Sequence, residues 1–463
     1  MMMTASDRAA GPGKAKATYR EWIGLAILAL PCILYAMDLT ILNLAVPSLS
    51  ADLKPTAAQL LWIVDAYGFM AAGSLLTMGT LGDRIGRRKL LLMGSAIFGI
   101  VSLVATLAPS AGLLIAARAL LGVASAAMAP STLSLISNMF RDDRERTFAV
   151  SVWVASFSFG GAIGPAVGGF ILAHFSWPAI FAVPVPFLAL LLLVGPAVLP
   201  EHKDPDAGRL DVLSAALSLA AVLPVIHGIK LFAEGGSSFW AAAAIALGFI
   251  AGLLFVRRQV RLADPLLDLR LLTRPGVTAA LTLNIFDFFV GFGILLLVAQ
   301  YLQLVLGLTP LQAGLWSMPA GFGSVLGSLL TAPMLRVMRP AFVLGSGLAL
   351  GAGALILMIY AVSAHGLILV VLGSVLLSIG TAPGTAIIAD LVVSAAPQER
   401  SGAASALSET TSEFGGALGI ALLGSLAEFF YRHELSQVIP VRSAAALRGI
   451  GTAASLSQRT GDA

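Results

Sequence analysis

The stretch GTLGDRIGRRK, from Gly79 to Lys89, separates two long apolar runs and gathers glycine and positive charge into one short link. Gly79, Gly82 and Gly86 allow a tight turn between two helices, and Asp83 can accept hydrogen bonds from amides at a helix N-terminus. Its cationic residues are Arg84, Arg87, Arg88 and Lys89. The stretch therefore indicates a dedicated turn between two helices, and a generic basic loop is the alternative.

The composition of the whole chain places these apolar runs in a membrane. Of the 463 residues, 58% are hydrophobic and 11% are charged, and the mean hydropathy is +0.93. A water-soluble domain carries about 25% charged residues. The chain is therefore predicted to be a membrane protein.

A spanning helix needs about 20 apolar residues, and such runs recur almost end to end. The predicted spans are 22–48, 59–80, 90–108, 111–137, 148–173, 179–199, 212–232, 239–256, 277–305, 312–335, 341–361, 366–389 and 403–428. The first run is too long for a cleaved signal peptide. The single cysteine, Cys32, excludes an intrachain disulfide and a multi-cysteine metal site.

Positive charge predicts the orientation of these spans, because Lys and Arg collect in cytoplasmic loops. Of the 28 Lys and Arg, 21 fall in segments that lie inside if the N-terminus is cytoplasmic, and the outer links hold one, Lys54. Two more, Arg118 and Lys230, fall within helices, and four lie in the C-terminal tail. The net charge of +4 thus reflects topology, and no nucleic-acid partner is expected.

Three more stretches carry recognisable patterns. LPCILYAMDLTILNLAVP (30–47) includes Pro31, Asp38, Thr40, Asn43 and Pro47; LLIAARALLGVASA (113–126) includes Arg118 and Gly122; GGAIGPAVGG (160–169) is rich in glycine. Further matches are WIVDAYGF (62–69), YLQLVLGLTPLQAGL (301–315) and SGAASALSETTSEFGGALG (401–419). With the Gly79–Lys89 link, these stretches resemble the fourteen-helix drug:proton antiporter family of the major facilitator superfamily. The resemblance covers about residues 22 to 428 and is strongest to the branch that exports quaternary ammonium compounds and cationic dyes.

The resemblance implies an all-α polytopic membrane protein with two helical bundles and two inserted helices. The implied division is an N-tail (1–21), a six-helix bundle (22–199), a linker (200–211), the inserted pair (212–256), a linker (257–276), a five-helix C-terminal bundle (277–428) and an outer tail (429–463). The family's fourteenth helix has no counterpart among these spans. Thirteen spans are therefore expected.

Ionisable residues inside a span are by default functional hypotheses, because an unpaired charge there is costly. Helical rise places Asp38, Asp65 and Arg118 at similar depths. A conformational change that alters their pairing could load and unload a proton, so these residues are the proton-coupling candidates, with Asp38 and Arg118 as the pair. The alternative is a fixed ion pair that only holds helices together.

Glu409 and Glu413 are four residues apart and share one face of the last predicted helix. Two carboxylates on one face suit a lipophilic cation or a proton relay; hydrogen bonding to neighbouring helices is the alternative. Tyr67 and Phe157 could stack on a cation or simply pack.

Other charged residues within the spans leave alternatives open. Asp287 could line the cavity with Asn284 or lie near a helix surface. Asp390 is expected to have a capping or interfacial role, and His227 to make a buried polar contact. Lys230 and Glu234 are expected to form an interfacial pair.

Gly160, Gly164 and Gly168 repeat every four residues, as do Gly161, Pro165 and Gly169, which predicts two adjacent ridges of small residues on one helix. Pro165 can bend that helix. The expected partner is the span 312–335, so that Gly160, Gly164, Pro165, Gly168 and Gly169 form a bending, sealing contact between bundles. Plain tight packing is the alternative.

The sequence thus predicts a proton-driven exporter of lipophilic cations that works by alternating access. It is expected to be a monomer in the cytoplasmic (inner) membrane, with its N-terminus in the cytoplasm. The proton gradient is its expected energy source, and no cofactor or metal is expected. Alternatives are the export of another amphiphile or metabolite, or a non-catalytic membrane sensor. No enzymatic constellation and no GxxxxGK[ST] nucleotide loop occur in the sequence.

Overall fold

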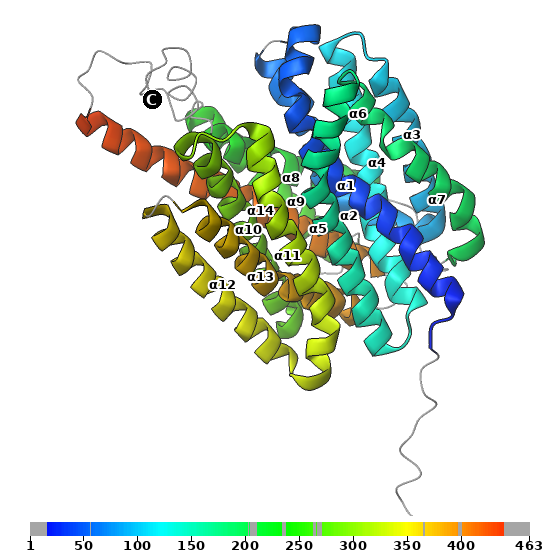
Figure 1. Ribbon diagram of the computed structural model, residues 1–463. Coiled ribbons are helices and arrows are strands. Elements are labelled where there is room, and N and C mark those ends of the chain that lie inside the picture. The colour runs from blue at the N-terminus through cyan, green and yellow to red at the C-terminus, as the bar shows by residue number, and fades with distance from the viewer. Residues whose placement is uncertain are drawn as a thin grey trace, which may run out of the picture.

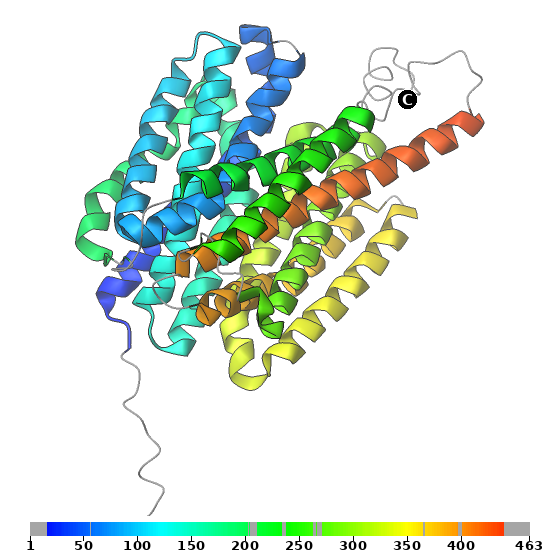
Figure 2. The same ribbon diagram turned by 180° about the vertical axis from the view of Figure 1, so that it is seen from behind.

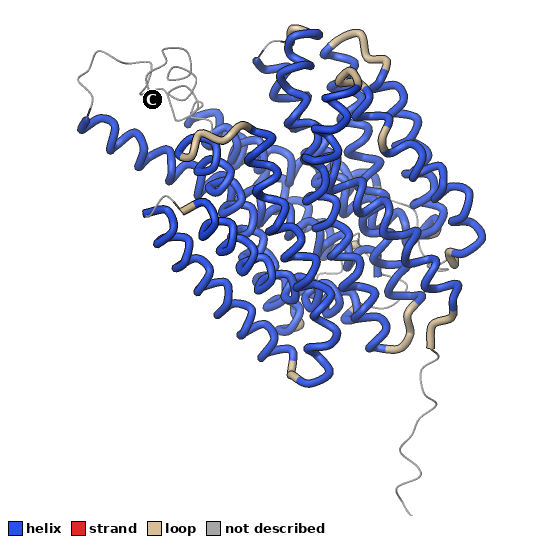
Figure 3. The backbone as a smooth tube through the Cα atoms, viewed as in Figure 1, coloured by secondary structure: helices blue, strands red, loops and turns tan. Residues whose placement is uncertain are grey.

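The computed structural model describes residues 16–55, 57–201, 203, 211–233, 238–262, 265, 271–363, 366–396 and 401–438. These ranges are helical almost throughout and contain no strand (Figure 3). The helices of the first half are α1 (Tyr19–Leu53), α2 (Ala57–Ile85), α3 (Arg87–Thr106), α4 (Ala111–Met139), α5 (Asp143–His174), α6 (Ala179–Ala182) and α7 (Pro184–Val198). They are followed by α8 (Val212–Ala233), α9 (Ser238–Arg261), η2 (Leu271–Thr273), α10 (Pro275–Gln300), η3 (Tyr301–Val305), α11 (Pro310–Val337), α12 (Pro340–Ser363), α13 (Leu367–Ala395) and α14 (Ser401–Val438).

Every predicted span overlaps a helix of the structure, and the all-α polytopic fold is confirmed. The sixth span is divided into α6 and α7 at Val183, because Pro184 and Pro186 follow and neither has an N–H to continue the helical ladder. Within the described ranges, ten helical segments are long and apolar enough to cross a membrane, and α8 contains a shorter apolar stretch, Leu213–Val225. The last helix continues ten residues past the predicted end at 428.

The helices begin where the sequence supplies caps. Ser110 accepts a hydrogen bond from the amide of Leu113 and starts α4, Asp142 accepts from two amides and starts α5, and Thr309 starts α11 with a capping box. Prolines lie inside α4, α5, α11 and α13. Spanning helices tolerate them because neighbouring helices cover the freed backbone groups.

Two sets of helices repeat the same packing pattern (Figure 1). In the first set α1 packs on α5, and α4 packs on α2 and α3; in the second set α10 packs on α14, and α13 packs on α11 and α12. The sets α1–α7 and α10–α14 therefore have a common internal plan.

The two sets meet along α5 with α11 and along α2 with α14. The pair α8–α9 lies at the second contact: α8 packs on both α2 and α14, as seen from behind in Figure 2. Thr77 of α2 and Ser218 of α8 share a hydrogen bond of 3.3 Å, and Gly73 lies against Leu219 and Leu223. Since α8 contacts both sets, it lies across the interface between them.

The links rich in positive charge gather at one face of the bundle. The amide of Ala17, just before α1, donates to Glu145 at the start of α5 at 2.7 Å. The amide of Arg88, at the start of α3, donates to Glu201 after α7 at 3.1 Å. We call this the basic face and the other end of the bundle the opposite face.

Candidate functional site

A hydrogen bond joins the two helix sets inside the bundle. The Tyr35 hydroxyl on α1 donates to Oε1 of Glu413 on α14 at 2.8 Å. Tyr35 is buried and Glu413 is half-buried. These residues are 378 positions apart in the sequence, so only the packing of one set on the other brings them together.

Three aromatic rings of the first set extend from Tyr35. Its ring centroid lies 5.8 Å from that of Tyr67 on α2 and 5.7 Å from that of Phe157 on α5. Trp153 meets Phe157 edge-on at 4.9 Å and donates its indole N–H to Thr132 at 2.9 Å, which fixes its orientation. The rings thus form one aromatic cluster that reaches the Glu413 carboxylate through the Tyr35 hydroxyl.

Glu409 lies one helical turn before Glu413 on α14. It is half-buried and close enough to Cys32 and Tyr35 of α1 to interact electrostatically with both. Among the described residues, none donates a hydrogen bond to its carboxylate. A different face of α14 packs on α10, where Asn284 donates to Ser412 at 2.8 Å. We call the two glutamates with Tyr35, Tyr67, Trp153 and Phe157 the central cluster.

Asp38 and Arg118 form a buried ion pair beside this cluster. Nη1 of Arg118 lies 2.5 Å from Oδ2 of Asp38, and the side chains are 1% and 12% exposed. Arg118 also donates from Nε to the carbonyl of Ile63 at 3.1 Å, and its guanidinium carbon lies 4.6 Å from the Tyr67 ring centroid. Tyr67 thus contacts both the ion pair and the central cluster.

The other predicted acidic residues are not brought into this cluster by any described contact. Asp287 on α10 accepts a hydrogen bond from Thr385 of α13 at 2.7 Å, within the second helix set. The side chains of Asp65 and Lys230, and Glu234 altogether, lie outside the described residues. His227 is exposed and stacks on Trp62, with ring centroids 6.3 Å apart, so the expected buried contact was wrong.

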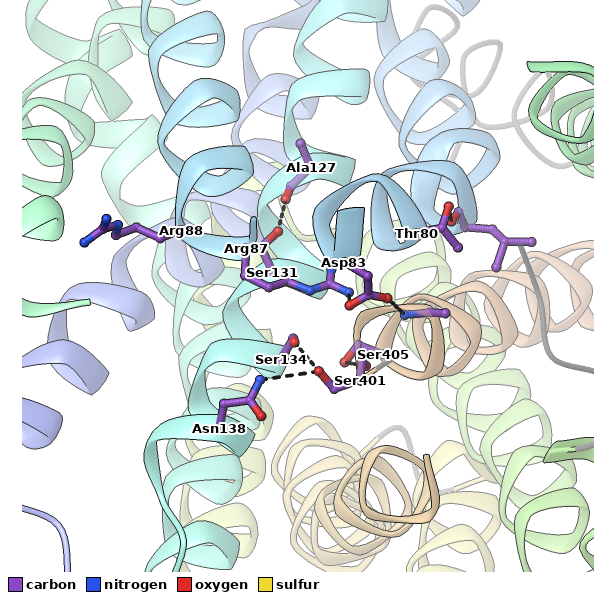
Figure 4. A network of polar contacts seen from close by, with 12 residues as sticks. Thr80, Asp83, Arg87, Arg88, Ala127, Ser131, Ser134, Asn138, Ser401 and Ser405 are labelled. Carbon is purple, nitrogen blue, oxygen red and sulfur yellow. Dashed lines mark hydrogen bonds and ion pairs between the residues drawn. The ribbon is translucent and has the colours of Figure 1, made fainter. Parts of the chain in front are cut away.

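The link after α2 forms a network at the basic face (Figure 4). Asp83 pairs with Arg87 and accepts a hydrogen bond at 3.1 Å from the amide of Ala403, in the first turn of α14. An acceptor is favourable there because the first amides of a helix lack helical partners. Arg87 is fully buried, so it is not a solvated loop charge. Asp83 thus connects α3 and α14 across the two sets.

The three glycines of this link have different surroundings, which corrects the expectation that all of them form the turn. Gly79 and Gly82 lie inside α2, where Gly82 leaves room for the Arg87 guanidinium. Only Gly86 is at the turn, with φ +111°, and a Cβ there would also meet the Glu201 carboxylate. Glu201 accepts from the first amides of α3, so the acid that caps this helix follows α7 in the chain.

Two more contacts connect the sets at the basic face. Ser134 of α4 shares a hydrogen bond of 2.5 Å with Ser401 of α14. Nε of Arg146 on α5 lies 2.8 Å from Oδ1 of Asp390 on α13, and Thr147 donates to the other oxygen at 3.3 Å. Asp390 therefore does not act as a simple helix cap; it pairs across the interface.

The two glycine ridges of α5 face different partners, so the single partner expected for them was wrong in part. Gly160 and Gly164 face α1, where an added Cβ would meet the Ile33 carbonyl or the Thr40 hydroxyl. Pro165 faces α11, where a Cβ on Gly314 would lie 3.0 Å from its ring.

The remaining positions extend this division of α5. A Cβ on Gly169 would lie 2.9 Å from Leu311 of α11, and Gly168, on the first ridge, is buried. Spacing along the chain predicts the ridges, but it cannot tell which helix each ridge meets.

Comparison with known proteins agrees with this arrangement. A family model described as the Major Facilitator Superfamily matches residues 28–420. The chain belongs to this superfamily. It is therefore a multi-pass membrane transporter of the major facilitator type, and not an enzyme.

Similar proteins include some that are named as efflux or resistance proteins. The chain is 41% identical to the multidrug efflux pump LfrA of Mycolicibacterium smegmatis, covering 96% of this chain and 89% of that protein. It is 34% identical to the methyl viologen resistance protein SmvA of Salmonella typhimurium, covering 88% and 83%. Among solved structures, the proton:xylose symporter XylE is similar in fold, with a TM-score of 0.62 at 15% identity, covering 95% of each chain.

Several contacts of this major facilitator were missed by reasoning from the sequence. Tyr35 lies within a quoted motif, and its position three residues before Asp38 was the available signal. Nothing in the sequence distinguishes Trp153 from the other aromatic residues of the chain. Nothing in the sequence pairs Arg146 with Asp390, 244 positions away.

Proposed function

We propose that this major facilitator is a proton-coupled efflux pump that exports lipophilic cations by alternating access. The observation that carries the proposal is the central cluster, in which Tyr35 of one helix set donates a hydrogen bond to Glu413 of the other and lies near Glu409. The Tyr35 ring contacts those of Tyr67 and Phe157. Carboxylates attract a cation, and an aromatic face contributes about 0.5 to 1 kcal/mol at an exposed site and about 2 kcal/mol when it is desolvated. Aromatic area also buries the apolar part of such a substrate.

The similar proteins support the substrate class. One is named a multidrug efflux pump and another a methyl viologen resistance protein. Methyl viologen is an aromatic cation, which fits a site that combines acids with aromatic rings.

In the proposed cycle, Asp38 and Arg118 couple the proton to the drug. Protonation of Asp38 ends its ion pair and frees the Arg118 guanidinium to shift against Tyr67, which also contacts Tyr35. Tyr67 is thus the physical connection between the proton site and the drug site. Asp65 is proposed as an accessory proton site, and Asp287 as a polar contact for substrates that reach the second set.

The proposed orientation places the basic face in the cytoplasm of a cell whose inner membrane holds the pump. The Asp83, Ser134 and Arg146 contacts then close the path toward the cytoplasm. Rocking of the two sets would break these contacts and open it. One elementary charge is worth about 2.3 kcal/mol per 100 mV, so one proton could sustain a tenfold or larger drug gradient.

The test is ethidium transport into proteoliposomes under an imposed pH gradient, with the purified full-length chain. Glu413→Gln and Glu409→Gln should each weaken ethidium binding at least about tenfold, the loss expected for about 1.4 kcal/mol. Asp52→Asn is the matched control, because this exposed carboxylate near the end of α1 accepts a hydrogen bond from Trp177 that an amide oxygen can also accept. Ethidium transport that ignores the pH gradient contradicts proton coupling, and unchanged binding in both glutamate variants contradicts the drug site.

A further inference from the structure

A small cavity lies beside Asp38, on a different side of α1 from the central cluster. Its walls are Leu34, Met37, Asp38, Ile41 and Leu42 of α1, with Ile180, Phe181 and Pro184 of α6 and α7. It has room for about one water molecule. We call it the lateral cavity.

The lateral cavity offers polar partners to a water molecule. Arg118 occupies Oδ2 of Asp38, and among the described residues none donates a hydrogen bond to Oδ1. Pro184 has no N–H, so the carbonyl of Ile180, four residues earlier, receives no α-helical hydrogen bond. Residues of the cavity wall thus hold two acceptors without a described donor, and a buried water is held by about two to four polar partners.

The two sites use different faces of α1. Tyr35 belongs to the central cluster and bonds to Glu413, whereas Leu34, Met37 and Ile41 line the lateral cavity. Asp38 borders both, because its carboxylate contacts Arg118 and also forms part of the cavity wall.

The cavity lies toward the opposite face of the bundle. Ile180, Phe181 and Pro184 belong to the first turns after the link 175–178, which joins α5 to α6 at that face. Pro184 lies six residues beyond this link, a depth of about 9 Å along a helix. A proton entering from that face thus has a short way to the cavity.

We propose that the lateral cavity holds a water through which protons from the opposite face reach Asp38, so that proton and drug approach α1 from different sides. This inference rests on the proposed proton-coupled export. In the step itself, the water takes up a proton that arrives from the opposite face and passes one of its own to Oδ1 of Asp38, so the water ends neutral and the ion pair with Arg118 ends. Arg118 stays charged, and the carbonyls of Ile63 and Val64 and the Tyr67 ring are the partners that remain for it as it shifts.

Few other titratable groups face this site. Arg118 on α4 and Tyr67 on α2 are the described ones, and Asp65 on α2 has a side chain outside the described residues. The residues 179–198 of α6 and α7 include none, and α5 carries charged residues only at its ends, at 143–146 and at His174. Asp38 is therefore the acceptor that a proton in the lateral cavity meets.

The experiment fills the cavity and separates proton-driven transport from drug movement. Ile180→Phe, and Ile41→Phe from the α1 side, place extra carbons in the cavity. Leu193→Phe makes a similar change on α7 at a side chain that is 79% exposed, and serves as the matched control. Ile180→Val, which adds no bulk, tests whether the site tolerates substitution.

Each purified variant is measured in proteoliposomes for ethidium uptake driven by a pH gradient and for ethidium exchange without a gradient. The filled variants should lose at least about tenfold in gradient-driven uptake, a change of 1.4 kcal/mol, and keep exchange within about twofold. Exchange needs drug binding and rocking but no proton entry. The Leu193→Phe and Ile180→Val variants should keep both gradient-driven uptake and exchange.

Two results overturn the inference alone: gradient-driven uptake that survives in both filled variants, or uptake and exchange that fall together, which marks a structural defect. Gradient-driven uptake that is absent from the unmodified protein overturns proton coupling and this inference with it. A variant that does not fold shows in size-exclusion chromatography, and the second filled variant then decides the question.

Discussion

Asp38 and Arg118 are 80 residues apart in the sequence and form a buried ion pair. Removing one charge of a buried pair leaves the other uncompensated, at a cost of about 3 to 5 kcal/mol when no other partner exists. Arg118 has other partners in two carbonyls and the Tyr67 ring. This explains how the same pair could open during transport without unfolding the bundle.

At the residue scale, the Asp38→Asn variant should therefore still fold but lose the coupling of drug transport to the proton gradient. The amide keeps the shape of the side chain but can neither take up a proton nor neutralise Arg118. We expect gradient-driven ethidium uptake to fall at least about tenfold, the equivalent of about 1.4 kcal/mol, with an unchanged size-exclusion profile. Uptake at the normal rate would remove Asp38 from the mechanism.

Tyr35→Phe tests the contact between the two sets at the same scale. The ring and its neighbours remain, and only the hydrogen bond to Glu413 is lost. A hydrogen bond to a charged group contributes about 1.5 to 3 kcal/mol, so ethidium affinity should change about tenfold or more. The direction is informative: tighter binding means that Tyr35 competes with the drug for Glu413, and an unchanged affinity means that the contact plays no part.

At the scale of elements, α5 has two faces with different roles. Gly160 and Gly164 let α1 approach within the first set, whereas Pro165 faces Gly314 of α11 in the second. Small residues permit such close approach between membrane helices. One face thus belongs to a packed unit, and the other to an interface that must move.

Gly164→Leu should consequently lower the yield of folded protein, because the side chain would displace α1. Gly314→Leu should leave expression near normal and lower gradient-driven transport, because it obstructs only the contact between the sets. Membrane abundance and ethidium uptake, measured in parallel, separate the two effects. Equal behaviour of the variants would contradict the division of faces.

A cluster outside the spans holds the base of the α8–α9 hairpin. Asp211, just before α8, accepts hydrogen bonds from Arg258 of α9 at 2.8 and 3.0 Å and from Ser214 at 2.8 Å. These bonds lower the pKa of Asp211 from 3.8 to about 2. Its stabilising contribution is therefore fully present above pH 3.8 and is lost as the pH falls through about 2.

Asp211→Asn should accordingly lower the melting temperature of the purified protein by the same amount at every pH from 5 to 8, since the carboxylate is ionised throughout that range. The measurement is thermal unfolding in detergent across the pH series. A difference that grows or shrinks between pH 5 and 8 would show that another group titrates with the hairpin.

At the scale of the whole molecule, the contacts of Asp83, Ser134 and Arg146 join the two sets at one face. The Arg146 and Asp390 side chains are 20% and 18% exposed, so their attraction is only partly screened. A transporter that alternates between two states must break such contacts in every cycle. Their strength therefore helps to set how often the basic face opens.

Arg146→Asp or Asp390→Arg alone should loosen this closure and change the transport rate, and the two together should restore it. A spin-label distance between α5 and α13 at the basic face measures the population of the open state. Arg144→Asp, a charge reversal at a nearby exposed position, is the control. If the double variant did not recover the normal transport rate and open-state population, the pair would not be what holds the basic face closed.

Much of this architecture could be predicted from the sequence, because apolar length, charge bias and short motifs are local properties. The runs between 22 and 428 predicted the helices, and the Gly79–Lys89 link pointed to the family. The division at Val183 was missed, although Pro184 and Pro186 were its signal.

The tertiary structure alone decided which side chains meet: Tyr35 with Glu413, Arg146 with Asp390, and Gly164 with α1 rather than α11. The physical reason is that consecutive residues of a helix point about 100° apart, so the partner of each depends on how distant helices rotate and pack, which spacing along one helix does not reveal.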